Sequence, residues 1–160
     1  NMSQQNINFT ASESKESSSE STIKVTLVGV LKRPDFFNAF FGGHVREAKA
    51  VITNWFKHYC PDHQGGYLEY LTTDNGGCFV VPSYEGKKKV SIPSNFYRGE
   101  MSAEAAGITA MLYTLNHLAW HLWERNSSDP LTDALNQRAE ALKAYAAAHE
   151  EGSAIFLAID

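Results

Sequence analysis

The chain has 160 residues, of which 43% are hydrophobic, and its 14 basic and 18 acidic side chains give a formal net charge of −4. This length and apolar content suit one domain with a packed core. The near-balanced charge excludes both a strongly basic nucleic-acid clamp and a densely acidic mimic of the DNA backbone.

The first 22 residues differ in composition from the rest of the chain. They are rich in Ser, Asn, Gln and Glu, with three consecutive serines at 17–19. Such a segment buries too little apolar surface to offset the entropy of ordering it. We therefore expect a disordered tail over residues 1–22 and one domain over residues 23–160. Because Asn1 precedes Met2, we expect Met2 to be the native start.

No signal peptide is visible, and no apolar run reaches the ~18 residues that would suggest a membrane span. The expectation is a soluble cytoplasmic protein. Cys60 and Cys78 are the only cysteines in the chain. Two cysteines in a chain of this length do not make a disulfide scaffold, so we expect two reduced thiols.

The N-terminal half of the domain reads as one extended segment followed by helix. Residues 23–31 (IKVTLVGVL) are rich in β-branched side chains, which suits a strand or an extended arm lying over the domain. The phenylalanines at 36, 37, 40 and 41 suit one helical turn or a hydrophobic plug. After Gly42 and Gly43, apolar residues recur at three- and four-residue steps over 44–59, which predicts a helix that Pro61 ends.

The middle of the chain reads as short strands joined by tight turns. Strands are predicted at 67–72, 78–82 and 87–92, with a fourth short strand possible at 96–100. Asn75, Gly76 and Gly77 tolerate positive φ and predict a hairpin turn between the first two strands. Closely spaced strands of this kind indicate an antiparallel meander of three to four strands.

Helices dominate the C-terminal third. Ser102 is the candidate N-cap of a helix that runs to about residue 125. Asp129 caps the next helix, with Pro130 at its first position, and that helix runs to about residue 149, where Gly152 stops it. The chain then stays apolar up to Asp160. The predicted fold class is α+β, a single domain in which the antiparallel sheet packs against three or more helices.

Four residue patterns stand out, and two of them carry candidate chemistry beside a structural interpretation. His117 and His121 are spaced to ligate a metal, but no third ligand is evident, so an amphipathic helix face is favoured. His58, Cys60, Asp62 and His63 cluster where a helix ends, and a small cysteine or histidine hydrolase is the alternative to a plain helix terminus. We expect no metal and no catalytic residues.

The remaining two patterns concern partners. Lys87, Lys88 and Lys89 form a basic run that suits a solvated strand edge or, alternatively, a weak nucleic-acid-binding module. Trp120 and Trp123 are expected in the buried core like Trp55, since an exposed tryptophan would mark a partner site. Because the chain is not net basic and has only one basic run, direct DNA binding is expected to be weak and to fade with salt.

Four motifs in order resemble the ArdB/KlcA antirestriction family. They are Asp62 with Gly65-Gly66-Tyr67; Asn75-Gly76-Gly77 with Val81-Pro82; residues 99–108 (GEMSAEAAGI); and Gly152-Ser153-Ala154-Ile155 with Ala158-Ile159-Asp160. The resemblance spans residues from about 36 to 160. The tail, the 23–31 segment and the aromatic-rich stretch at 117–123 depart from it.

The resemblance implies a compact α+β protein that is not an enzyme and needs no cofactor. Such proteins are carried by plasmids, phages and genomic islands and protect incoming DNA from host type I restriction enzymes. The implied partner is a host type I restriction-modification complex or another defence protein, inhibited through protein contact and not through DNA mimicry. The candidate partner-binding residues are Asp62, Asn75, Arg98, Glu100 and Asp160.

Asp160 ends the chain with two carboxylates on one residue, held by the apolar residues before it. A fixed anion of this kind can pair with an arginine of a partner. It can equally pair within the chain, with Arg98 or Arg125. Both alternatives stay open at the level of sequence.

Overall fold

A computed structural model describes residues 22–63 and 65–160. The elements, in chain order, are β1 (Val25–Leu27), η2 (Val30–Lys32), α3 (Arg33–Phe41), η3 (Gly42–His44), α4 (Val45–Tyr59), β2 (Leu68–Thr73), β3 (Cys78–Pro82), β4 (Lys87–Ile92), η4 (Pro93–Asn95), β5 (Tyr97–Ser102), α5 (Ala103–Arg125), α6 (Pro130–Ala147) and α7 (Gly152–Ile159). The predicted tail lies outside the described residues, apart from Thr22.

The α+β fold class is confirmed, and the predicted meander is divided between two antiparallel sheets. β1, β2 and β3 form one sheet in that order, while β4 and β5 form a separate two-stranded sheet. The chain leaves the first sheet at Pro82, which has no N–H to extend the ladder, and turns at Gly86 with a φ of 66°. Residues 23–31 contribute a paired strand, since Val25 lies opposite Thr73.

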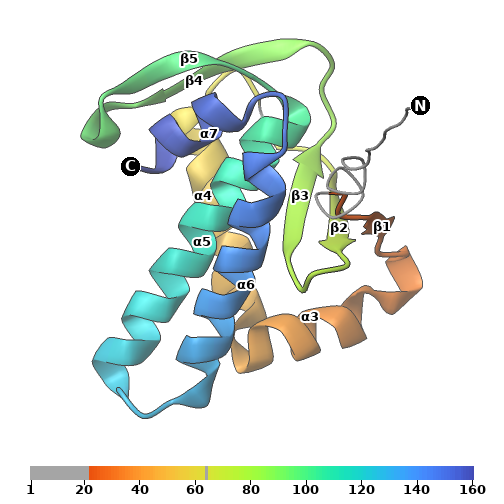
Figure 1. Cartoon of the computed structure of the whole chain (residues 1–160), viewed down its shortest axis with the longest axis vertical. Coiled ribbons are helices and arrows are strands. Elements are labelled where there is room, and N and C mark those ends of the chain that lie inside the picture. Colours follow the sequence, from red (N-terminus) through yellow and green to blue (C-terminus); the bar gives the residue numbers. More distant parts are fainter. Residues whose placement is uncertain (1–21, 64) are drawn as a thin grey trace, which may run out of the picture.

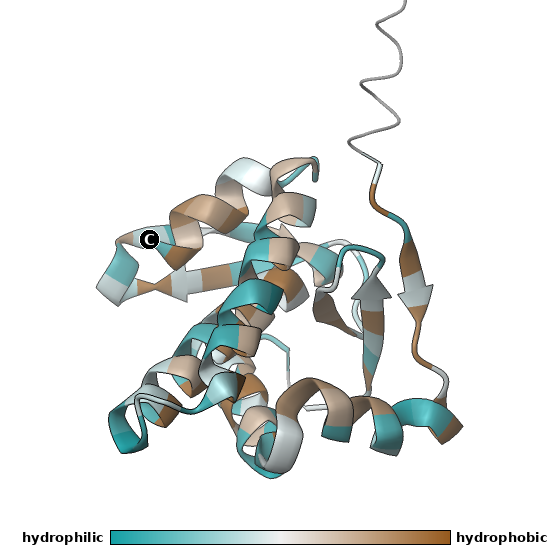
Figure 2. Ribbon diagram, turned by 60° about the horizontal axis from the view of Figure 1, so that its bottom comes forward, coloured by the Kyte–Doolittle hydropathy of each residue, from teal (hydrophilic) through white to brown (hydrophobic). Residues whose placement is uncertain are grey.

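The core is built around α5, the longest helix, which runs beside α6 through the length of the molecule (Figure 1). Its buried side chains include Ile108, Met111, Leu115 and Leu118, and they pack against α4, α6, α7 and β3. Figure 2 shows hydrophobic and hydrophilic residues alternating along the helices and strands. Gly107 lies directly against the β3 backbone, because a Cβ there would sit 1.6 Å from the Val80 carbonyl oxygen.

Both predicted helix caps are confirmed. The Ser102 hydroxyl accepts a hydrogen bond from the Ala105 amide, 3.2 Å away, at the start of α5. The Asp129 carboxylate accepts one from the Leu131 amide, 2.9 Å away, and Pro130 opens α6. Each cap satisfies an N–H that has no partner inside its own helix.

Two expectations about the C-terminal third are wrong. Trp120 and Trp123 are 57% and 50% exposed, not buried, although Trp55 is buried as expected at 2% exposure. The two exposed indoles lie off the apolar stripe of α5 and stack on each other, with ring centres 5.8 Å apart. Gly152 does not stop a helix that runs to residue 149; α6 ends at Ala147 and Gly152 begins α7.

Gly76 is the residue of the β2–β3 turn that needs positive φ, since its φ is 104°. Gly76→Val is expected to lower the free energy of unfolding by about 1–3 kcal/mol, because a β-branched side chain fits this backbone region poorly. Chemical denaturation measures the loss. Gly29→Val is the control: Gly29 has a φ of −61° and open space around it, so a change within about 0.5 kcal/mol is expected. Equal effects of the two substitutions would contradict the strain assigned to Gly76.

Candidate functional site

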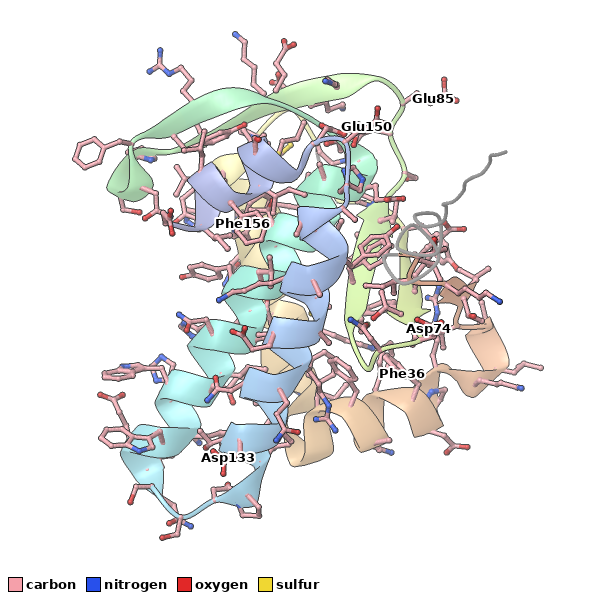
Figure 3. All side chains as sticks on the ribbon, in the orientation of Figure 1. Phe36, Asp74, Glu85, Asp133, Glu150 and Phe156 are labelled. Atoms are coloured by element: carbon pink, nitrogen blue, oxygen red, sulfur yellow. The ribbon has the colours of Figure 1, made fainter. Side chains whose placement is uncertain are left out.

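The hairpin formed by β4 and β5 presents a charged outer face. Lys89 lies opposite Glu100 and Ser91 opposite Arg98, so these side chains share one side of the hairpin. Lys87, Lys89, Arg98 and Glu100 are exposed, whereas the other side buries Val90, Ile92 and Met101 against the body. Long side chains rise from the outer face, away from the body (Figure 3).

The middle lysine of the basic run points the other way, as strand alternation predicts. The Lys88 ammonium donates to the Asp62 carbonyl oxygen at 2.9 Å and lies 5.2 Å from the centre of the Tyr84 ring. Lys88 therefore ties the hairpin to the end of α4. Of the three lysines in the basic run, only Lys87 and Lys89 lie on the outer face. The Lys87 ammonium is 4.0 Å from the Glu151 carboxylate.

A phenylalanine stands at the tip of this hairpin. Pro93–Asn95 form a short 3-10 turn, and the Phe96 amide closes it by donating to the Pro93 carbonyl at 3.1 Å. Phe96 has a φ of 54°, the only positive φ of a non-glycine residue in the described ranges, and its side chain is 98% exposed. An aromatic side chain in a left-handed backbone without packing contacts is unfavourable for the isolated protein. Its position instead suits an anchor for a partner.

The C-terminus lies beside this tip (Figure 1). The Asn95 side-chain amide donates to the Ala158 carbonyl of α7 at 2.7 Å, which joins the turn to the last helix. Ile155 and Ala158 are buried, so the residues directly before Asp160 form a helix that packs against the body. We define the hairpin corner as the exposed residues Lys89, Phe96, Arg98, Glu100 and Asp160.

Within the described residues Asp160 forms no ion pair, so neither internal partner considered for it is engaged. Arg125 pairs instead with Glu47, at 3.6 Å, and Arg98 points outward from β5. The terminal anion is therefore available to a partner. Of the five candidate residues, Arg98 and Glu100 lie on the outer face of the hairpin, and Asp160 follows α7, which Asn95 joins to the hairpin tip.

The other two candidate residues lie apart from the corner. The Asn75 side chain accepts from the Thr73 hydroxyl at 2.6 Å and donates to the Ala141 carbonyl at 2.9 Å, which ties the β2–β3 turn to α6. This turn is at the far end of the first sheet, next to Asp74 in Figure 3. Asp62 lies at the base of the hairpin, beyond the end of α4, with an exposed side chain.

The geometry around Cys60 favours a structural thiol. Cys60 and Cys78 are buried and unpaired with each other, and burial raises the pKa of both thiols. The His63 ring is buried between Phe56 and Tyr84, and burial followed by the charge of Lys88 lowers its pKa. A neutral thiol beside a neutral imidazole is poorly suited to nucleophilic attack.

The two histidines of α5 contact each other on its outer side, with ring centres 4.3 Å apart. Burial, followed by the neighbouring His121, lowers the pKa of His117, although Glu47 opposes the shift. Among the described residues no group of three or more His, Cys, Asp or Glu side chains is placed to hold a metal ion. The same residues include no helix long and apolar enough to cross a membrane.

Sequence reasoning missed two residues of this region. The sequence predicts a turn at residues 93–95 and a possible strand from Phe96, whereas the structure places Phe96 at the end of that turn and begins β5 at Tyr97. Glu151 gave no local signal at all. Its carboxylate accepts hydrogen bonds from the Ser102 amide, at 3.0 Å, and from the Ser102 hydroxyl, so it completes the cap of α5 from 49 residues away.

Comparison with known proteins places these features in a family context. The family model described as "Antirestriction protein" matches residues 61–160. The chain is 33% identical over 139 residues to an Escherichia coli protein named antirestriction protein KlcA, covering 86% of this chain and 95% of the relative. A second E. coli KlcA is 34% identical over 143 residues, covering 88% and 95%.

A solved structure shares the fold as well as the sequence. It matches with a TM-score of 0.76 at 33% identity, covering 86% of this chain and 95% of that one. It is described as a structure of the KlcA and ArdB proteins, which show a novel fold and antirestriction activity against type I DNA restriction systems in vivo but not in vitro.

Proposed function

This chain belongs to the antirestriction protein family of KlcA and ArdB, and we propose that it protects incoming mobile DNA from a host type I restriction complex or a related defence complex. The proposed action is inhibition through protein contact inside the bacterial cell, without chemistry of its own. Family membership, with the activity described for KlcA and ArdB, is the main support.

The charge of the chain supports contact over DNA mimicry. A mimic of the phosphate backbone needs a dense array of negative charges, whereas this chain has 14 basic side chains against 18 acidic ones. The exposed surface of the β4–β5 hairpin is itself mixed, with Lys89 beside Glu100. A surface of mixed charge suits recognition of another protein.

The hairpin corner is the partner-binding surface that we propose. Phe96 supplies an apolar anchor. The charges of Arg98 and Glu100 on the hairpin and of Asp160 at the C-terminus can set the orientation of the partner. Phe96 has a φ of 54° and is 98% exposed, so its side chain adds no packing to the core. We expect this side chain to be buried when the partner binds.

Phe96→Asn is expected to reduce protection about tenfold or more while leaving the protein at least as stable, because Asn tolerates the left-handed region and no packing is lost. The measurement is the plating efficiency of unmodified phage on strains with and without a type I restriction system, since the relatives act in vivo.

Asp160→Asn is expected to lower protection as well, with a melting-temperature change below about 2 °C.

Leu31→Asn is the matched control, because Leu31 is also an apolar side chain, 96% exposed, but lies in η2 and not on the hairpin. Wild-type protection by Phe96→Asn and Asp160→Asn would overturn the assignment of the corner.

Two further results would favour the alternative functions. If wild-type protein bound duplex DNA with sub-micromolar affinity at about 150 mM salt, the nucleic-acid-binding alternative would replace contact with a protein. Loss of protection by Cys60→Ser at unchanged stability would favour the hydrolase.

A further inference from the structure

An open cavity of about 650 Å³ lies between α3, α4 and β2, away from the hairpin corner. We call it the tyrosine groove; its lining includes Arg33, Phe37, Lys49, Thr53, Tyr67 and Tyr70. A second cavity of about 300 Å³ adjoins it, shares Thr53, Gly66 and Leu68, and adds Lys57 and His63. The size of the groove falls in the range of small-molecule sites.

Aromatic rings hold two cations in place at the groove. The Arg33 guanidinium lies 4.9 Å from the centre of the Tyr67 ring and 5.3 Å from that of Tyr70, and its Nη2 donates to the Tyr67 hydroxyl at 2.6 Å. The Lys49 ammonium lies 4.4 Å from the centre of the Phe37 ring. Cation–π contacts orient these groups but leave their positive charge uncompensated.

The polar groups of the groove are not saturated by the protein. Within the described residues neither Arg33 nor Lys49 has a carboxylate partner, and the buried Arg33 Nε has no hydrogen-bond partner. Burial raises the pKa of Tyr70 to about 12, so that residue supplies no negative charge. A guanidinium with unused donors is matched by a carboxylate or a phosphate.

The charged residues that line the two cavities are all cationic. Arg33, Lys49 and Lys57 all contribute, and no Asp or Glu is among the described residues that line either cavity. Some other cations of the described residues do have carboxylate partners, such as Arg125 with Glu47 and Lys143 with Glu140. An unpaired cluster of cations in a concave, partly apolar site raises the local concentration of anions.

We propose that the tyrosine groove binds a small organic anion in which a phosphate or carboxylate is joined to a flat ring, as in a nucleoside monophosphate. Arg33 and Lys49 pair with the anion, and the ring lies against Tyr67, which is 52% exposed. This binding is separate from the antirestriction activity and does not depend on it.

The test titrates the full chain with four probes: adenosine 5′-monophosphate, benzoate, adenosine and inorganic phosphate. Calorimetry gives the affinity, and amide chemical shifts locate the site. At least one of the two ring-bearing anions is expected to bind with a sub-millimolar dissociation constant, and adenosine and phosphate at least about tenfold more weakly. Lys49→Met keeps an unbranched side chain over Phe37 and is expected to weaken binding about tenfold, as is Arg33→Gln. Lys24→Met removes a charge outside the groove and is expected to change nothing.

Three results would overturn the proposal. The first is that neither ring-bearing anion shifts the groove amides at concentrations up to about 10 mM, which would exclude useful binding. The second is that adenosine, which lacks the anionic group, or inorganic phosphate, which lacks the ring, binds as tightly as the ring-bearing anions. The third is that Lys24→Met weakens binding as much as Lys49→Met, which would indicate attraction by overall charge.

None of these results depends on phage protection, which is measured separately. A failure of this proposal is therefore distinguishable from a failure of the proposed function.

Discussion

Replacing Gly107 with alanine is expected to lower the free energy of unfolding by about 3 kcal/mol or more, or to prevent folding. A Cβ at this position would lie 1.6 Å from the Val80 carbonyl oxygen and 2.6 Å from its carbon. These are backbone atoms of β3, so no side-chain rotation can make room. Either α5 moves away from the sheet or β3 is distorted, and both changes loosen the buried centre of the molecule.

Chemical denaturation with circular dichroism measures this loss, and expression of folded protein is the first readout. Gly43→Ala is the control, because Gly43 has negative φ and no atom within 4 Å of a built Cβ. That variant is expected to stay within about 0.5 kcal/mol of wild type. Wild-type stability of Gly107→Ala would mean that α5 and β3 do not approach as closely as described.

Glu151→Ala is expected to cost about 2–3 kcal/mol of stability, because it removes the charged acceptor of two hydrogen bonds from Ser102. The Ser102 amide would then be left part-buried without a partner at the start of a 23-residue helix. Glu150→Ala is the matched control. Glu150 precedes Glu151 but is exposed, so little change is expected.

The contribution of Glu151 is also expected to depend on pH. Burial alone would raise the pKa of this carboxyl, but the hydrogen bonds from Ser102 and the charges of Lys87 and His149 outweigh it and lower the pKa. A carboxyl with a lower pKa in the folded state stabilises above its unfolded pKa and loses that contribution as the pH falls. The stability difference between wild type and Glu151→Gln is therefore largest near neutral pH and shrinks below about pH 4.3. A difference independent of pH would contradict this assignment.

The predicted helices and the β2–β3 turn depended on signals within a few residues. Ser102 caps α5 through the amide three positions later, and Gly76 has the positive φ that its turn requires. Such features can be read from sequence because the interacting groups are neighbours in the chain. The family resemblance has the same basis, since its motifs are short local runs of residues.

The composition of the candidate site was predictable in part. Arg98, Glu100 and Asp160 were named at the level of sequence. The structure places Arg98 and Glu100 on the outer face of the β4–β5 hairpin, and it places Asn75 apart from them, at the β2–β3 turn. The exposure of Trp120 and Trp123 had an available signal, because both fall outside the three- and four-residue periodicity of the buried α5 stripe.

The sequence by itself determined the α+β class, the long central helix, its caps, and membership of the antirestriction family. Only the tertiary structure decided which residues distant in the chain meet: Glu151 with Ser102, Gly107 with Val80, and Asn95 of the hairpin tip with Ala158 of α7. The physical reason is that periodicity and capping act over about four residues and specify each element alone. Whether a side chain such as Phe96 packs or stays exposed depends on which elements cover it, and that is settled only when helices and sheets pack together.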